Sequence, residues 1–164
     1  MNKIAAKIVL IGSIGVGKTS LIRQFVHGEF ADEYLSTIGV KVDKKTIELS
    51  ETTVDLLVWD IAGEIYLSNL FNKYLKGAAG VIGVFDITRP ETHDNLIEIF
   101  EELKKNTPAI HKTIIANKSD LLDDKEHSKY IRSNYTYDFM TSAKTGVHVQ
   151  DAFTKMACTI ITSI

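Results

Sequence analysis

The feature that most constrains the fold of this chain is a glycine-rich octapeptide, Gly12-Ser13-Ile14-Gly15-Val16-Gly17-Lys18-Thr19. It follows an apolar run that ends at Ile11, and it precedes apolar residues at helical spacing. Strand, loop and helix in this order match the P-loop pattern, in which glycines let backbone N–H groups turn toward a phosphate and the helix dipole favours its charge. We therefore expect a phosphate site formed by residues 13–17 together with Lys18, Thr19 and Ser20.

Strands and helices alternate along the rest of the chain. Hydrophobic patterning and turn residues predict strands at 40–49, 53–61, 80–85, 113–116 and 137–141, and helices at 65–76, 91–105, 124–134 and 147–163. Such alternation implies an α/β fold with right-handed crossovers. We expect one P-loop domain over residues 1–164, with a mostly parallel six-stranded sheet, one antiparallel edge strand and helices on both faces.

Bulk composition narrows the class of protein further. The chain has 164 residues and a net charge of −2, so electrostatics gives no reason to expect nucleic-acid binding. Its single cysteine and the lack of a long apolar run favour the cytoplasm over secretion or membrane spanning. No lipid anchor is encoded here, so membrane contact would need a partner or a tail outside this sequence. We expect a monomer.

An aspartate followed by a glycine ends the strand predicted at 53–61. In Trp59-Asp60-Ile61-Ala62-Gly63, Asp60 is suited to hold Mg²⁺ together with the hydroxyl of Thr19. The N–H of Gly63 is then expected beside a γ-phosphate. A strand-end aspartate alone is more often a helix cap or a solvated turn residue, and only its pairing with the P-loop favours the metal.

Two further polar segments lie at the ends of the strands predicted at 113–116 and 137–141. In Asn117-Lys118-Ser119-Asp120, the aspartate is able to accept hydrogen bonds from the N1–H and the 2-amino group of guanine, a donor pair that adenine lacks. Thr141-Ser142-Ala143-Lys144 is suited to supply a backbone N–H to the guanine oxygen. The order of the segments predicts a site for GTP or GDP with Mg²⁺.

Taken together, these residues resemble the Ras superfamily of small GTPases, most closely its Rab branch. The resemblance spans nearly the whole chain and includes Tyr34-Leu35-Ser36-Thr37-Ile38-Gly39, Tyr74-Leu75-Lys76-Gly77-Ala78 and Phe85-Asp86-Ile87-Thr88. It implies that Thr37 completes the Mg²⁺ shell, that Gly63 bonds the γ-phosphate, and that Phe30 and Tyr34 contact the nucleotide.

The same resemblance implies a molecular switch. Residues 32–40 and 62–76 would be the switch segments that bind an effector protein in the GTP state, with exchange and activating factors acting on the cycle. Lys18, Thr37, Gly63 and residue 64 would be the residues that act in GTP hydrolysis.

Two positions depart from the family pattern. Glu64 stands where most members carry the glutamine that orients the attacking water, and a carboxylate cannot donate a hydrogen bond as an amide does. Ile14 stands where a small residue is frequent, and its branched side chain would project toward the γ-phosphate. We expect slow intrinsic hydrolysis, and a negative φ at residue 14.

Two other functions remain open at this stage. Guanine nucleotide could serve as a structural ligand of a binding module that docks a partner without cycling, and Glu64 keeps this alternative open. A P-loop kinase or ATPase is disfavoured by residues 117–120 and by the absence of a lid-like cluster of arginines.

Overall fold

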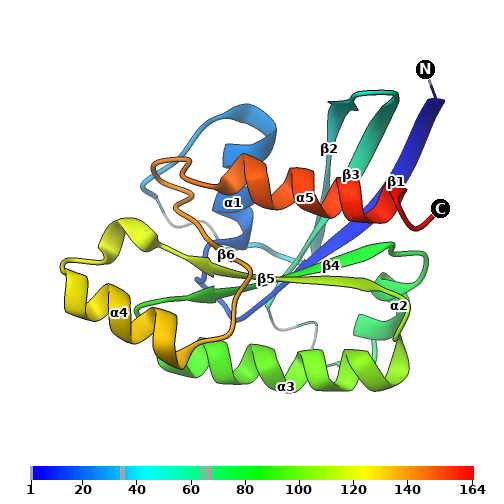
Figure 1. The fold of residues 1–164 in the computed structure, drawn as a ribbon. Coiled ribbons are helices and arrows are strands. Elements are labelled where there is room, and N and C mark those ends of the chain that lie inside the picture. The colour runs from blue at the N-terminus through cyan, green and yellow to red at the C-terminus, as the bar shows by residue number, and fades with distance from the viewer. Residues whose placement is uncertain (1, 34–35, 64, 66–67) are drawn as a thin grey trace.

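The computed structural model describes residues 2–33, 36–63, 65 and 68–164, and within them a six-stranded sheet forms the centre of the molecule (Figure 1). The strand order is β2-β3-β1-β4-β5-β6. Five strands run parallel, and only β2 pairs antiparallel, with β3. The strands are β1 (Asn2–Ile11), β2 (Val40–Leu49), β3 (Thr52–Ile61), β4 (Gly80–Asp86), β5 (His111–Asn117) and β6 (Phe139–Met140). This arrangement confirms the predicted fold class.

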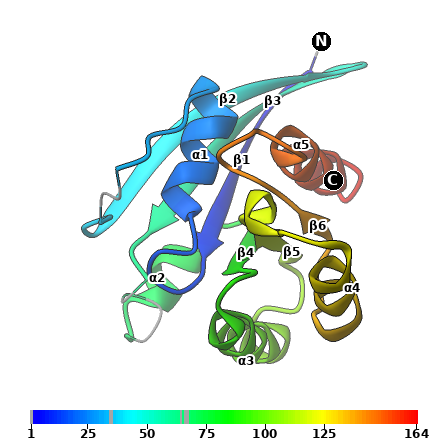
Figure 2. The ribbon, with the colours of Figure 1, turned by 90° about the vertical axis from the view of Figure 1, so that its left-hand side faces the viewer.

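Helices cover both faces of the sheet (Figures 1 and 2). One face carries α1 (Lys18–His27) and α5 (Val149–Ile161), and the other carries α2 (Phe71–Leu75), α3 (Pro90–Asn106) and α4 (Lys125–Asn134). On the first face the rings of Phe25 and Phe153 stack with centroids 4.1 Å apart. Burying a side chain of this size contributes about 1.5–3 kcal/mol, so the stack is one of the stronger links between α1 and α5.

The central strand β4 is buried along its whole length, as its uninterrupted apolar sequence predicts for a parallel strand covered on both faces. The edge strand β2 instead alternates buried or half-buried and exposed residues over most of its length. No helix within the described residues is long and apolar enough to cross a membrane.

Among the described residues of the segment 65–76, only Phe71–Leu75 form an α-helix, α2, so the predicted helix is wrong in its extent. Before it, the Ser68 hydroxyl donates to the carbonyl of Ile65 at 2.7 Å, and the N–H of Leu70 donates to the Ser68 hydroxyl at 3.3 Å. Such local bonds compete with the helical ladder and favour turns. Gly77, at φ 77°, follows the helix.

The parallel strands place their carboxyl ends at one edge of the sheet. The segments that follow β1, β3, β4 and β5 therefore gather there, although they are far apart in sequence (Figure 2). Ligands of open α/β sheets bind at this edge. Apart from the segment that holds Thr37, which precedes β2, the polar segments singled out from the sequence lie at or just after the ends of these strands or after β6.

Candidate nucleotide-binding site

The lysine of the phosphate loop is held inside the loop. Lys18 is 7% exposed, and its Nζ donates to the carbonyls of Gly12 at 2.7 Å and Ser13 at 3.1 Å. Burial lowers the pKa of Lys18 to about 8, the nearby carboxylate of Asp60 opposes this shift, and the charge of Arg89 adds to it. A negative ligand in the loop would favour the charged form of this lysine.

Gly17 shows why the loop needs a glycine where α1 begins. Its φ is 101°, and a Cβ at this position would collide with Nδ2 of Asn117. The same amide nitrogen donates to the carbonyl of Val16 at 3.0 Å. The loop therefore passes directly against Asn117, which a larger residue at position 17 would prevent.

Three side-chain oxygens converge beside the phosphate loop. The Thr19 hydroxyl lies 2.5 Å from that of Thr37 and donates to Oδ2 of Asp60 at 2.5 Å, and the Thr37 hydroxyl lies 3.4 Å from the same carboxylate oxygen. Asp60 is 1% exposed, and its Oδ1 has no hydrogen-bond partner among the described residues. A buried carboxylate oxygen without a partner, next to two hydroxyls, fits the oxygen ligands that Mg²⁺ prefers.

No group of three or more His, Cys, Asp or Glu side chains able to hold a metal occurs in the part of the chain that the structure describes. A cation at Asp60 would thus draw its remaining ligands from hydroxyls, water or a bound phosphate. Mg²⁺ is commonly held in this way, by one or two carboxylates together with substrate phosphates.

The segments predicted to recognise a base are tied together by Asn117. Its Oδ1 accepts from the Thr141 hydroxyl at 3.0 Å and from the N–H of Ala143 at 3.2 Å. The Ser142 hydroxyl donates to Oδ1 of Asp120 at 2.7 Å and so orients that carboxylate. Lys118 has a left-handed φ of 71°, rare for a residue with a side chain.

These segments surround one cleft of about 390 Å³. Most of the residues predicted for the site line it: Ile14, Gly15, Gly17, Lys18, Thr19, Ser20, Phe30, Thr37, Gly63, Asn117, Lys118, Asp120, Ala143 and Lys144. Ser13, Val16, Asp60 and Ser142 stand behind this lining and contact it through the hydrogen bonds given above. Tyr34 and Glu64 lie outside the described residues.

Ile14 lies at the mouth of the cleft and is 50% exposed. Within the described chain, the only residues other than glycine with positive φ are Lys118 and His148, so the expected negative φ of Ile14 is confirmed. Gly63 packs closely on it, since a Cβ at position 63 would lie 3.0 Å from the backbone nitrogen and from Cγ1 of Ile14.

The cleft also includes residues that the sequence did not assign to nucleotide binding: Arg23, Ala31, Asp32, Glu33, Ser36, Ala62 and Leu121. Asp32, Glu33, Ser36 and Ala62 fall in the expected switch segments, and no motif marks the other three. Lys144 and Asp32 approach to 4.0 Å across the cleft mouth.

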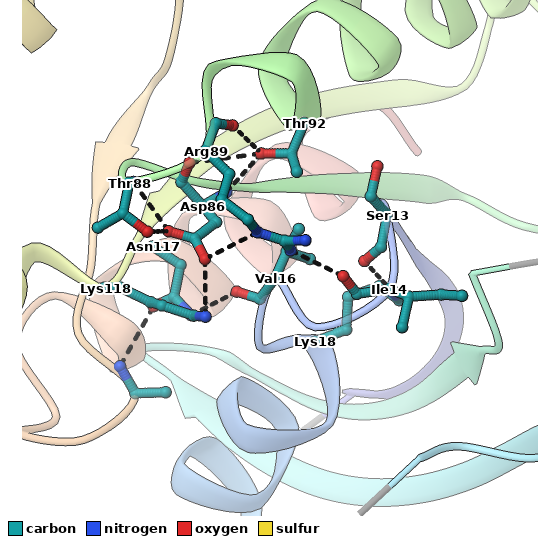
Figure 3. A network of polar contacts seen from close by, with 11 residues as sticks. Ser13, Ile14, Val16, Lys18, Asp86, Thr88, Arg89, Thr92, Asn117 and Lys118 are labelled. Carbon is teal, nitrogen blue, oxygen red and sulfur yellow. Dashed lines mark hydrogen bonds and ion pairs between the residues drawn. The ribbon is translucent and has the colours of Figure 1, made fainter. Parts of the chain in front are cut away.

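The sequence also missed a polar network behind the cleft, centred on Asp86 (Figure 3). This carboxylate is 2% exposed and accepts from Lys118 Nζ at 2.7 Å, from the Thr88 hydroxyl at 2.6 Å and from Arg89 Nε at 3.3 Å. Burial acts to raise the pKa of Asp86, but the bonds from Lys118 and Thr88 outweigh it and hold the pKa below its usual value. The available signs were a charged residue at the carboxyl end of β4 and the place of residues 85–88 in the family resemblance.

Comparison with known proteins gives consistent matches over almost the whole chain. The model of the Ras family matches residues 7–162. GTP-binding protein YPTM2 of Zea mays is 36% identical over 160 residues, covering 94% of this chain and 79% of that protein. Ras-related protein Rab-1 of Theileria annulata is 34% identical over 158 residues, covering 92% of this chain and 72% of that protein. Ras-related protein Rab-13 of Rattus norvegicus is 34% identical over 161 residues, with 94% and 79% covered.

Proposed function

The chain belongs to the Ras family of small GTP-binding switch proteins, and on this premise we propose that its cleft binds GTP or GDP together with Mg²⁺. One observation carries the proposal: the phosphate loop, Asp120 and Ala143 border the same cleft. The two ends of the cleft thus offer the chemistry of a phosphate chain at Lys18 and of a guanine edge at Asp120.

In this proposal each segment has a separate task. Lys18 and the N–H groups of residues 13–17 bind the phosphates, with Ser20 beside them, and Thr19, Thr37 and Asp60 hold Mg²⁺, which would neutralise phosphate charge. Asp120 accepts the two guanine donors, Ser142 orients Asp120, and a backbone N–H of the segment 141–144 faces the guanine oxygen. Asn117, Lys118 and Lys144 shape the base pocket, and Phe30, which is half-buried at the cleft, packs on the base.

We further propose that the bound GTP is hydrolysed slowly. Gly63 would face the γ-phosphate, while Glu64, outside the described residues, would replace an amide that orients water with a negative group. Ile14 supports the proposal, because its side chain occupies the cleft mouth beside Gly63. An incoming arginine of an activating protein would have to pass this side chain.

The partners follow from the same premise. We propose that residues 32–40 and 62–76 bind an effector in the GTP state. We also propose that exchange and activating factors control the rates of nucleotide exchange and of GTP hydrolysis. Two apolar side chains in these ranges support it, since Ile38 is 93% exposed and Leu70 is 47% exposed. We propose that the protein acts in the cytoplasm and reaches membranes through a partner or through a tail outside this sequence.

Calorimetry with the purified protein tests nucleotide binding directly. GDP and GTP with Mg²⁺ should bind tightly and ATP should not, because adenine cannot satisfy Asp120. Tight ATP binding without uptake of GDP or GTP would refute the proposal.

A non-cycling module that keeps guanine nucleotide as a structural ligand is the second candidate, favoured only by Glu64. A partner that is captured equally by the GDP-loaded and GTP-loaded forms would support this second candidate. A partner with equal affinity for both forms does not shift the equilibrium between them, so the nucleotide would not act as a switch.

A further inference from the structure

Arg89 bonds the backbone of the phosphate loop. It is the residue before α3, and its Nη2 donates to the carbonyl oxygen of Ile14 at 2.7 Å (Figure 3). Arg89 is not among the described residues that line the cleft. Its contact is therefore with the backbone of the loop rather than with the space that a ligand would fill.

The guanidinium is anchored at its other end by Asp86. The Arg89 Nε donates to Oδ2 of Asp86 at 3.3 Å, and the same oxygen lies 2.7 Å from Lys118 Nζ. One buried carboxylate thus holds a residue of the base-recognition segment and the arginine that reaches the phosphate loop. The loop and the base segment are joined through two ion pairs and one hydrogen bond.

The backbone around Arg89 is itself fixed. The Thr92 hydroxyl donates to the carbonyl of Arg89 at 2.7 Å and accepts from the N–H of Asp86 at 3.0 Å. Thr92 is 1% exposed, so its bond to the N–H of Asp86 is shielded from water. The guanidinium therefore extends from a rigid base.

Ile14 is held from two sides. Arg89 bonds its carbonyl oxygen, and the backbone of Gly63 packs against its nitrogen and side chain. Without the bond from Arg89, the peptide group of Ile14 would be held only by its packing against Gly63. This peptide group lies where the loop turns around the proposed phosphate.

We propose that Arg89 is a positioning residue of nucleotide binding, which fastens the phosphate loop at Ile14 to the base segment at Lys118 through Asp86 and so slows nucleotide release. The inference rests on the proposed function. Arginine suits the task, since its planar fork donates in two directions at once, whereas a lysine ammonium is a point charge.

Release of a fluorescent GDP analogue, displaced by excess GDP with Mg²⁺ present, measures the effect. Arg89→Ala should release the analogue about three- to tenfold faster than the parent protein, the range expected for losing one charge-assisted hydrogen bond that is partly exposed. Arg89→Lys should stay closer to Arg89→Ala than to the parent. Arg132→Ala is the matched control, an exposed arginine in the last turn of α4, and should leave release unchanged.

Two further measurements separate positioning from a general loss of structure. The phosphorus NMR resonance of the β-phosphate of bound GDP should shift or broaden in Arg89→Ala, because the loop around it has lost its support. The thermal unfolding of the GDP-bound variant should remain a single cooperative transition, which shows that it is folded.

The outcomes are distinct. Release and β-phosphate resonance equal to those of the parent would overturn the inference while nucleotide binding stands. A hundredfold loss of GTP hydrolysis with unchanged release would also overturn it, since Arg89 would then act on the reaction. If the parent protein binds no GDP, the proposed function fails and the inference with it.

Discussion

Asn117 donates a hydrogen bond from Nδ2 to the carbonyl oxygen of Val16, 3.0 Å away and 101 residues earlier in the chain. The other end of its amide accepts from Thr141 and from the N–H of Ala143. One side chain, 1% exposed, therefore joins three segments of the cleft and satisfies both ends of its own amide.

Replacing Asn117 with alanine should lower the free energy of unfolding by about 2–4 kcal/mol, because several buried polar groups would lose their partner. Urea denaturation measures the change. Asn134→Ala is the matched control: its amide bonds a carbonyl four residues earlier on the exposed side of α4, and its removal should cost less than about 0.5 kcal/mol. Equal losses in the two variants would contradict the role given to Asn117.

Asp120→Asn should change which base is bound. An amide offers one acceptor and one donor, so it cannot accept both guanine hydrogens, and the affinity for GDP should fall by about 10²-fold or more. Xanthosine diphosphate, which carries an oxygen in place of the 2-amino group, should bind the variant better than GDP does. Calorimetry with both nucleotides checks this.

The control for Asp120→Asn is Asp123→Asn, the same change at an exposed position three residues further along. It should keep the preference of the parent protein. An Asp120→Asn variant that still prefers GDP would show that another group reads the base.

Binding of GDP should be accompanied by proton uptake near pH 8. In the empty protein burial holds the pKa of Lys18 at about 8, and phosphates beside the ammonium raise it again. At pH 8 the empty protein therefore carries only part of this proton, and binding should take up about half a proton per site.

Calorimetric titrations in two buffers of different ionisation enthalpy measure the proton count. The uptake should be small near pH 7, where Lys18 is already about nine-tenths charged. If the number of protons taken up on binding is the same at pH 7 and pH 8, Lys18 is fully charged before the nucleotide binds, and the prediction fails.

Glu64→Gln should raise the rate of single-turnover GTP hydrolysis by at least about tenfold, because the amide both accepts and donates a hydrogen bond to water. Glu51→Gln makes the same chemical change at an exposed residue in the turn between β2 and β3, outside the lining of the cleft. It should leave the rate unaltered. A parent rate that already equals that of Glu64→Gln would remove the case for slow hydrolysis.

The strands and most helices are predictable from this sequence because each carries a local signal. Gly28 is an example: glycine is common directly after a helix, and α1 ends before Gly28, which is left-handed and donates its N–H to the carbonyl of Gln24. The buried strand at 80–85 follows from its continuous apolar run. In the segment at 65–76 the apolar spacing suggests a long helix, but Ser68 forms competing local bonds that the spacing does not reveal.

The long-range contacts were not predictable in this way. The residues around Arg89 indicate only that it precedes a helix. Its bond to Ile14 joins two residues that are 75 positions apart in the sequence. That bond exists because β4 pairs directly beside β1, which brings the turn after one strand against the loop after the other. The sequence pattern indicates that both strands exist and are parallel, but it does not state that they are neighbours.

The ring stack of Phe25 on Phe153 has a consequence for synthesis of the protein. Helix α1 starts at Lys18, and its inner face rests on α5, which the ribosome produces after every other helix and strand described. A nascent chain that lacks α5 already contains the whole glycine loop, yet the helix that follows this loop lacks the part of its packing surface that α5 supplies. We therefore expect the nascent chain to bind nucleotide only late in synthesis, after α5 has left the ribosome and packed against α1.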